Sequence, residues 1–341
     1  DRQVCRSFFV PGRRFYPLPF QPRRFYAIMA LTESEVGKMA VLWELCEGGA
    51  RVLRVLGDSP CPDVPAAVAG RPVTEIGPYC FADRPLQGGT LWPEGSADTH
   101  PVTGNFVEEV TLPDSVRVLH SAAFYNCRRL RRVELGPGLE SLGSDLFTNC
   151  RALETFALRA APGDDTGLKK LLGAVSADVS AVFLNAPGAR LFYPEYMELL
   201  DENTPAHIFN HSIEGEGYRM RQCFAGGSVD YAAYDATFAQ ACVGEPEEKM
   251  VRMALGRLLC PFALRDDART DYEFYLTAHA GAAFALAIAG RWEEALRLLV
   301  RLGLPVREAA ARCARAGWSA GSAILLARPG RAAKRYDFDD L

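Results

Sequence analysis

Apolar and polar positions in the first half of the chain repeat with a period of 23 residues, as an alignment of 107–129 with 130–152 shows. Each copy begins with the alternation of a short strand and continues through a turn into a short apolar and aromatic segment. The aligned apolar positions are Val110, Val133 and Phe156; Leu112, Leu135 and Leu158; Leu119 and Leu142; Phe124 and Phe147; and Leu130 and Leu153. A unit of about 20–29 residues with one strand is typical of a leucine-rich repeat solenoid. Because one coil cannot bury its apolar side chains alone, we expect these positions to point inward between stacked coils.

A further copy lies upstream, on the other side of an insertion. Ile76 and Phe81 precede Leu119 and Phe124 by 43 residues, which is one period plus 20 inserted residues. The inserted residues fall in the Gly-, Pro- and Thr-rich stretch 87–106, where we expect a surface loop.

Two looser copies are expected at the ends of the repeat region. The Val-Pro pair at 64–65 resembles the Leu-Pro pair at 112–113. Downstream, the apolar run 182–184 lies 26 residues past 156–158, and 169–175 forms the predicted helical part of that coil.

Ahead of the repeats, two short apolar runs at 41–46 and 51–56 flank Glu-Gly-Gly at 47–49. Two such runs around a pair of glycines predict a β-hairpin. We expect this hairpin to cap the solenoid and to protect its first strand edge.

Past about residue 195 the composition changes to Ala, Leu, Glu and Arg in helical spacing. One helix is expected after Pro246, because proline and the acidic residues 247–248 suit a first helical turn. One or two further helices are expected within 266–289. Short helices separated by glycines are predicted at 292–302, 306–316 and 319–327. Short helices at this spacing indicate stacked helix pairs.

Three phrases of the repeat region carry a family resemblance: VTEIG at 73–77, LPDSV at 112–116 and AFYNC at 123–127. Residues 50–195, which hold these phrases, resemble the BspA-like bacterial leucine-rich repeat. The resemblance implies a scaffold that contacts proteins or glycans, found in both surface adhesins and intracellular proteins, and it implies no particular activity. The segment 193–235 resembles a C-terminal extension of some intracellular clostridial-type leucine-rich repeat proteins.

The expected fold class is therefore α+β, with a short BspA-like leucine-rich repeat β-solenoid followed by an all-α helical domain. The expected divisions are a disordered or non-native leader at 1–28, a β-hairpin cap at 29–57, the solenoid at 58–195, the helical domain at 196–328 and a flexible tail at 329–341.

Charge argues against a nucleic-acid partner. The 341 residues hold 38 Lys and Arg against 42 Asp and Glu, a net charge of −4, whereas nucleic-acid binders normally carry a basic excess. Residues 1–28 alone carry six Arg and one Asp, so the remainder is more acidic than the total suggests. An Arg-rich arm that binds nucleic acid or a membrane surface is the alternative to a leader without function. No apolar run is long enough for a transmembrane helix, so no membrane partner is expected.

Ten cysteines are scattered without a Cys-x-x-Cys motif, which indicates free thiols and a reducing compartment. Cys127 and Cys150 share a repeat position, so stacking makes a disulfide between them conceivable, but the repeat alone explains the pair. We therefore expect thiols and a cytoplasmic location, since no secretory signal is recognisable. A surface location is the alternative.

One pair of histidines is a candidate metal site. His207 and His211 would share a helix face at i and i+4, with Glu214 or Glu216 as a third ligand, but Ile208 replaces the Glu of the His-Glu-x-x-His motif. No phosphate loop or nucleophile elbow occurs. We expect no metal, no cofactor and no enzymatic activity. An enzyme or metal site around 207–234 is the alternative.

The remaining candidate site is the outward face of the repeat strands. Residues that alternate with buried positions should project from a sheet to solvent. They are Glu109, Thr111, Arg132, Glu134, Thr155 and Ala157. Two uses are open for their charges, pairing between neighbouring coils or contact with a partner, and the basic run 128–132 is expected to be solvated. The predicted function is a non-enzymatic scaffold or adaptor that binds a protein partner through this face, and a cell-surface adhesin is an alternative.

Overall fold

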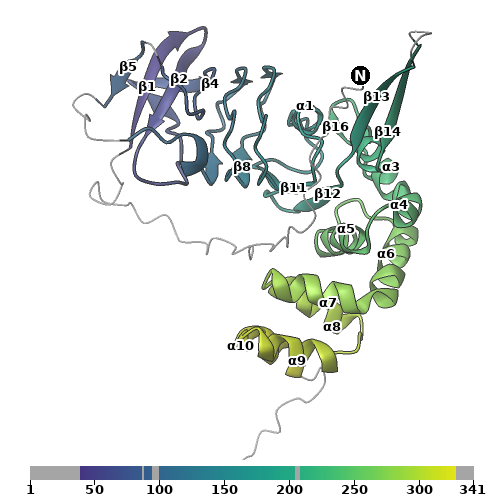
Figure 1. Cartoon of the computed structure of the whole chain (residues 1–341). Coiled ribbons are helices and arrows are strands. Elements are labelled where there is room, and N and C mark those ends of the chain that lie inside the picture. Colours follow the sequence, from purple (N-terminus) through teal and green to yellow (C-terminus); the bar gives the residue numbers. More distant parts are fainter. Residues whose placement is uncertain (1–38, 87, 94–99, 204–207, 328–341) are drawn as a thin grey trace, which may run out of the picture. The chain divides into compact units, whose positions relative to one another are not determined.

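The computed structural model describes residues 39–86, 88–93, 100–203 and 208–327 (Figure 1). The leader predicted at 1–28 and the tail predicted at 329–341 lie outside these residues. No helix in the described part of the chain is both long enough and apolar enough to cross a membrane.

Two sheets form the walls of a β-solenoid, which confirms the predicted fold class (Figure 1). The first sheet has the order β5 (Thr90–Trp92), β1 (Ala40–Cys46), β2 (Gly49–Leu56), β4 (Arg71–Ile76), β7 (Val118–Leu119), β9 (Ser141–Leu142), with β3 (Ala67–Val68) paired to β4. The second has the order β12 (Ala189–Tyr193), β11 (Val179–Phe183), β10 (Thr155–Leu158), β8 (Arg132–Leu135), β6 (Glu109–Thr111). The chain alternates between the two sheets from β6 to β10, so each coil adds one strand to each.

Strand register follows the 23-residue period. Leu119 pairs with Leu142 in the first sheet, and Val110 pairs with Val133 in the second. Ile76 pairs with Leu119, which confirms the 43-residue spacing across the insertion. The looser upstream copy is confirmed as well, because Asp63 forms a parallel bridge with Thr111 and Val64 N–H donates to Thr111 O at 2.9 Å.

A column of phenylalanine rings fills the interior. The ring centroids of Phe81 and Phe124 lie 5.0 Å apart, and those of Phe124 and Phe147 lie 5.3 Å apart, both in stacked geometry. Phe156 continues the column at 5.4 Å from Phe147. The other inward positions are buried as predicted, except Leu142, which is partly exposed; Leu112, Leu119 and Leu130 are fully enclosed.

The repeated Asn-Cys pair shapes one corner of each coil. Asn126 and Asn149 have φ of 62° and 63°, a left-handed conformation that asparagine tolerates better than most residues. The Cys127 thiol donates to the Phe81 carbonyl at 3.2 Å, and the Cys150 thiol donates to the Phe124 carbonyl at 2.9 Å. Both cysteines are free thiols, as predicted. The hydrogen bond to Cys150, together with burial, raises the pKa of the Cys127 thiol, so this thiol stays neutral.

Parts of the insertion at 87–106, where a surface loop was predicted, form regular structure. Its residues Thr90–Trp92 form β5, which pairs antiparallel with β1, and Gly104–Phe106 form a 3₁₀ turn. Two-sided pairing of β1, with β2 and with β5, explains why this stretch becomes a strand despite its Gly and Pro content.

The downstream coil deviates by one residue from the predicted alignment. Phe156 pairs with Ala181 and Leu158 with Phe183, so the spacing is 25 residues rather than 26. The predicted match of Val182 with Phe156 is therefore wrong. Because successive strand residues point to opposite faces, the shift turns Val182 outward. Helix α1 (Leu168–Gly173) lies in this coil where the helical part was predicted.

Hairpins terminate the two sheets at opposite ends. Strands β1 and β2 pair antiparallel around Glu47 and Gly48, as predicted, and β2 then pairs with β4 to begin the first sheet. At the other end, β11 and β12 form an antiparallel hairpin that finishes the second sheet.

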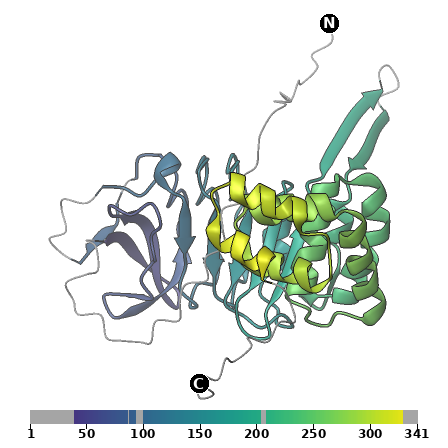
Figure 2. The same ribbon diagram turned by 90° about the horizontal axis from the view of Figure 1, so that it is seen from below.

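The segment from 197 to 214 is a hairpin and not part of the helical region. Its strands β13 (Met197–Asn203) and β14 (Ile208–Glu214) pair only with each other and protrude from the rest of their unit (Figure 2). Composition predicted that the helical domain begins at residue 196, and this boundary is wrong. The Asn-Thr-Pro sequence at 203–205 opposes a continuous helix, because proline disfavours helical backbone at itself and at the residue before it.

Helices follow this hairpin, as predicted. They are α2 (Gly217–Met220), α3 (Tyr231–Ala236), α4 (Phe238–Gly244), α5 (Glu247–Leu259) and α6 (Asp266–Ala278), with a small two-stranded sheet of β15 (Phe224–Ala225) and β16 (Ser228–Val229) between α2 and α3. Helix α5 begins directly after Pro246, with Glu247 and Glu248 in its first turn.

A second compact unit begins at Leu276. It contains α7 (Ala280–Ala289), α8 (Glu293–Arg301), α9 (Arg307–Arg315) and α10 (Ser319–Leu326). The turns within its two helix pairs are alike: Trp292 N–H donates to Ala287 O at 2.8 Å, and Trp318 N–H donates to Cys313 O at 3.0 Å. Helices α7 and α9, and α8 and α10, also contact each other, so the unit is a stack of two helix pairs, as predicted.

The phenylalanine column provides a test of coil stacking. Phe124 is fully buried between two rings, so we expect Phe124→Ala to lower the free energy of unfolding by about 3–5 kcal/mol. Urea denaturation followed by circular dichroism measures the change. Phe106→Ala is the control, because Phe106 is 41% exposed and should cost much less. Equal losses in the two variants would contradict a stabilising column.

Candidate functional site

The predicted face residues come together in two rows on the second sheet. Register aligns Glu109 with Arg132 and Arg132 with Thr155, which forms the first row. The second row aligns Thr111 with Glu134 and Glu134 with Ala157. Both rows lie on the face opposite to the buried positions. We call this surface of β6, β8 and β10 the strand face.

Five of the six residues are accessible. Glu109 is exposed, and Thr111, Arg132, Glu134 and Thr155 are half-buried. The sixth, Ala157, has no exposed surface and cannot touch a partner. In the strand register it lies between Glu134 and Val182.

Helix α5 covers the end of the second sheet beyond the strand face. The Arg252 guanidinium lies over the Phe192 ring at 5.2 Å, and Gly256 approaches the Arg190 carbonyl so closely that an added Cβ would be 3.1 Å from it. The Tyr234 hydroxyl closes the sheet edge, because it donates to Phe192 O at 2.6 Å and accepts from Phe192 N–H at 2.9 Å. Strand β12 is thus covered, and the accessible face comprises β6, β8 and β10 together with the partly exposed Ser180 of β11.

Charges on the strand face pair with each other. Glu134 accepts from Arg132 at 2.8 Å and from Arg159 at 2.9 Å, and Arg159 also pairs with Asp114 at 2.8 Å. Burial opposes ionisation of Glu134, but hydrogen bonds from the two arginines outweigh it and lower the pKa of its carboxyl. Of the two uses left open by the sequence, pairing is realised within this network, which holds the side chains in fixed positions.

The basic run at 128–132 is likewise partnered. Arg129 pairs with Glu108, and Arg132 with Glu134. The Glu154 carboxyl, whose pKa is raised by burial, lies near Arg131 and Arg252. These contacts support a solvated, ion-paired surface rather than a phosphate site.

Sequence reasoning missed a second charged cluster, on the outer side of the first sheet. Glu75 accepts from Arg51 at 2.7 Å and lies 2.6 Å from the Nε2 atom of His120. Arg51 also pairs with Glu44 at 2.7 Å. Burial raises the pKa of Glu75, but the hydrogen bonds to His120 and Arg51 outweigh this effect and lower it. The repeat alignment could not reveal the cluster, because Glu75 and His120 are diagonal neighbours and do not share a repeat position.

His211, one of the two histidines considered for a metal, does not lie on a helix. His211 is in β14 opposite Leu200, and its Nε2 atom is 3.4 Å from Glu198. His207 lies outside the described residues. Because His211 lies in a strand, the predicted helix face is not formed at this residue. Across the described ranges, no group of three or more His, Cys, Asp or Glu side chains is arranged to hold a metal.

Two buried arginines near the junction are instead held by several hydrogen bonds. Arg257 forms two hydrogen bonds to the Asp235 carboxylate, at 2.7 and 2.9 Å, and Tyr272 donates to the same carboxylate at 2.8 Å. Arg221 donates to backbone carbonyls of four residues, Val175, Ala177, Pro194 and Gly217. This arrangement fastens helices α2, α3 and α5 to each other and to the solenoid end.

Comparison with known proteins identifies the repeats. Residues 103–162 match the family described as BspA type Leucine rich repeat region (6 copies). A leucine rich cell surface protein from Faecalibacterium prausnitzii A2-165 is similar in structure, at 20% identity and a TM-score of 0.23, over 39% of this chain and 37% of that chain. No curated protein matches. The central repeats are therefore BspA-type leucine-rich repeats.

The network around Glu134 predicts a pH-dependent stability difference. The folded pKa is lowered, so the stabilisation is fully present above the unfolded value of about 4.3 and is lost as the pH falls through the folded pKa. Glu134→Gln should lower the free energy of unfolding by about 1 kcal/mol at pH 7, and the difference should narrow below about pH 4. Urea denaturation at both pH values measures it. Glu140→Gln, at a carboxyl that is 75% exposed, is the control and should change little. A difference that stays constant with pH would exclude the proposed ion pairing.

The buried Arg257–Asp235 pair predicts a larger effect. Asp235→Ala leaves the Arg257 charge without its partner in the interior, so we expect a loss of about 3–5 kcal/mol. Thermal and urea unfolding measure the loss. Glu293→Ala removes an exposed helical pair with Arg297 and should cost no more than about 0.5 kcal/mol. A small effect of Asp235→Ala would show that the network is dispensable.

Proposed function

We propose that this chain, which carries BspA-type leucine-rich repeats, is a non-enzymatic interaction protein that binds another protein through the strand face. The observation that carries the proposal is the arrangement of Glu109, Thr111, Arg132, Glu134 and Thr155 in two aligned rows on a sheet whose other face is packed. Sites built on rigid strands hold their side chains more accurately than loops do.

The charge network favours a polar partner surface with both signs of charge. Arg132, Glu134, Arg159 and Asp114 are held in place before a partner arrives. Binding then loses little side-chain freedom, and complementary charges determine partner choice and association rate more than affinity. The hairpin β1–β2 serves in this proposal as the solenoid cap, and the helical region beyond residue 196 as an adaptor.

A reducing compartment, and therefore a cytoplasmic location, is part of the proposal. Its support is the free state of the described cysteines, including Cys80, Cys127 and Cys313, which are buried. Burial raises the pKa of Cys80 to about 12, which keeps it protonated and slow to oxidise. Detection of the protein on intact cells would instead favour the adhesin alternative.

Charge reversal on the strand face tests the function. Proteins retained by the immobilised full chain from a lysate of the source cells are identified by mass spectrometry, and the affinity of the retained partner is then measured. Glu109→Arg combined with Thr155→Arg should weaken that affinity by at least about tenfold, or about 1.4 kcal/mol. Glu47→Arg is the control, because Glu47 lies in the exposed turn of the β1–β2 hairpin.

Two results would refute the strand face as the binding surface. One is unchanged affinity in the double variant while its unfolding curve matches that of the parent protein. The other is an equal loss in the Glu47→Arg control, which would indicate a general charge effect.

A further inference from the structure

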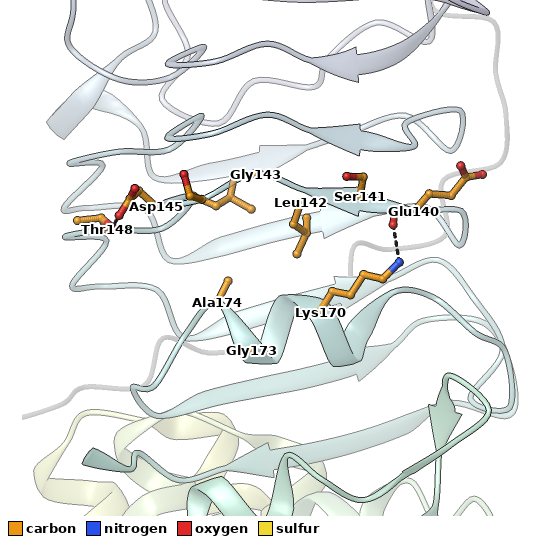
Figure 3. Close-up of a pocket in the computed structure, with 11 residues that line it drawn as sticks. Glu140, Ser141, Leu142, Gly143, Asp145, Thr148, Lys170, Gly173 and Ala174 are labelled. Atoms are coloured by element: carbon orange, nitrogen blue, oxygen red, sulfur yellow. Dashed lines mark hydrogen bonds between the residues drawn. The ribbon is translucent and has the colours of Figure 1, made fainter. Parts of the chain in front are cut away.

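A groove separates the last strand of the first sheet from helix α1 (Figure 3). Its volume is about 530 Å³, and it is open to solvent. One wall is β9 with the turn that follows it, and the other is the exposed side of α1. The residues that line it are Glu140, Ser141, Leu142, Gly143, Ser144, Asp145, Leu146, Thr148, Lys170, Gly173 and Ala174.

The β9 wall carries backbone N–H groups whose equivalents in the preceding coil are hydrogen-bonded. Three N–H groups of that coil donate to carbonyls of the next: Ala122 to Ser144 at 2.9 Å, Phe124 to Leu146 at 3.1 Å and Asn126 to Thr148 at 2.9 Å. The N–H groups one period later, those of Asp145, Phe147 and Asn149, have no backbone acceptor within the described part of the chain. Strand β9 is also the last of its sheet. The groove is therefore bordered by an open strand edge.

Side-chain burial also shows that the edge of β9 is open. Leu119 is fully enclosed by the coil on each side, whereas its repeat equivalent Leu142 is partly exposed. Helix α1 lies where the next strand would be expected, but it fills this space only at one end. There Lys170 donates to the Glu140 carbonyl (Figure 3). At the other end the helix offers only Gly173 and Ala174, which leave room for an additional backbone.

The two edges of the solenoid's C-terminal end thus differ. In the second sheet, the Tyr234 hydroxyl takes both backbone groups of Phe192, and Ala189 forms an antiparallel bridge with Pro261. In the first sheet, Lys170 satisfies a single carbonyl. Open edges pair readily with an added strand, and extended peptides are commonly bound in this way.

Charge indicates which peptide suits the groove. Within the solenoid, the Nε atom of Arg117 lies 3.8 Å from the carboxylate of Glu140 on the next coil. An added strand one period beyond β9 would place its equivalent residue on the opposite side of Glu140. The nearby Asp145 is also exposed. A basic side chain at the position equivalent to Arg117 therefore complements Glu140 and Asp145. The Lys170 side chain, which reaches the Glu140 carbonyl at this end, has to move aside when the strand adds.

We propose that this groove binds an extended segment of a partner protein, which adds to β9 as a short parallel strand and carries a basic side chain beside Glu140. The site is separate from the strand face and does not depend on the function proposed for it. Backbone hydrogen bonds supply affinity, and the basic residue supplies selectivity.

The probe is a fluorescein-labelled peptide that copies residues 116–126, VRVLHSAAFYN, the segment that lies against β9 on its paired side. Fluorescence anisotropy with the full chain should give saturable binding. The same peptide with its Arg replaced by Glu should bind at least about fivefold more weakly, since it places like charges together. Hydrogen exchange should show new protection at Leu142, Asp145, Phe147 and Asn149.

A groove-filling substitution supplies the matched protein variant. A Cβ at Gly173 meets nothing within 4 Å, and the residue is not in a left-handed conformation, so Gly173→Phe places its ring in open space. It should weaken peptide binding by at least about tenfold. Gly281→Phe in α7 is the control, because a Cβ there also meets nothing. It should leave peptide binding unchanged.

Four results would overturn the proposal. The first is no saturable binding up to about 1 mM peptide, and the second is equal binding by the Gly173→Phe variant and the parent protein. The third is protection of the four amides before peptide is added, which would mean that the chain itself fills the groove. The fourth is dimerisation that Gly173→Phe suppresses, which would make a second copy the occupant. None of these experiments involves the strand face, so failure here is distinguishable from failure of the proposed function.

Discussion

Every coil of this solenoid depends on its neighbours for both its core and its backbone hydrogen bonds. A single coil contributes one ring to the column of Phe81, Phe124 and Phe147, and that ring is buried only because another lies on each side. The same holds for the N–H groups at the coil corners, which find their acceptors one period along the chain. Stability in such an arrangement is a sum of nearest-neighbour contacts. The end coils lack a neighbour on one side, so they need capping elements.

The two sheets of the solenoid are closed at their ends by different elements. Antiparallel hairpins begin the first sheet and finish the second, and the helices after residue 217 complete the closure of the second sheet through Tyr234 and α5. This closure also covers β12, so the accessible part of the second sheet ends at β11. Architecture and surface are therefore linked: the elements that stabilise the final coil determine how much of the sheet remains available, and they leave β9 open.

Sequence reasoning succeeded where burial recurs at a fixed interval. The pairing of Ile76 with Leu119 could be predicted across a 20-residue insertion, because inward positions keep their apolar identity. It failed where the interval changed. Between β10 and β11 the helix α1 replaces a turn, and the spacing of 25 residues moved Val182 to the other face. The hairpin at 197–214 escaped prediction because both of its faces are exposed where its side chains are described, so no alternation marks it.

The sequence also could not predict which outward positions are buried or paired. Ala157 lies at an outward position by alternation, yet it has no exposed surface. Pairs such as Glu75 with His120 depend on diagonal contacts that a linear alignment does not contain.

The placement of the terminating hairpins bears on how this protein could change over evolutionary time. Because neither hairpin contacts the coil formed by residues 130–152 through its own strands, a tandem duplication of that segment would lengthen both sheets by one strand and leave their ends as they are. Coil number is then a variable that recombination within the gene can alter in single steps. The terminal elements, in contrast, must be inherited intact, and the surface between them can grow or shrink without redesign of either end.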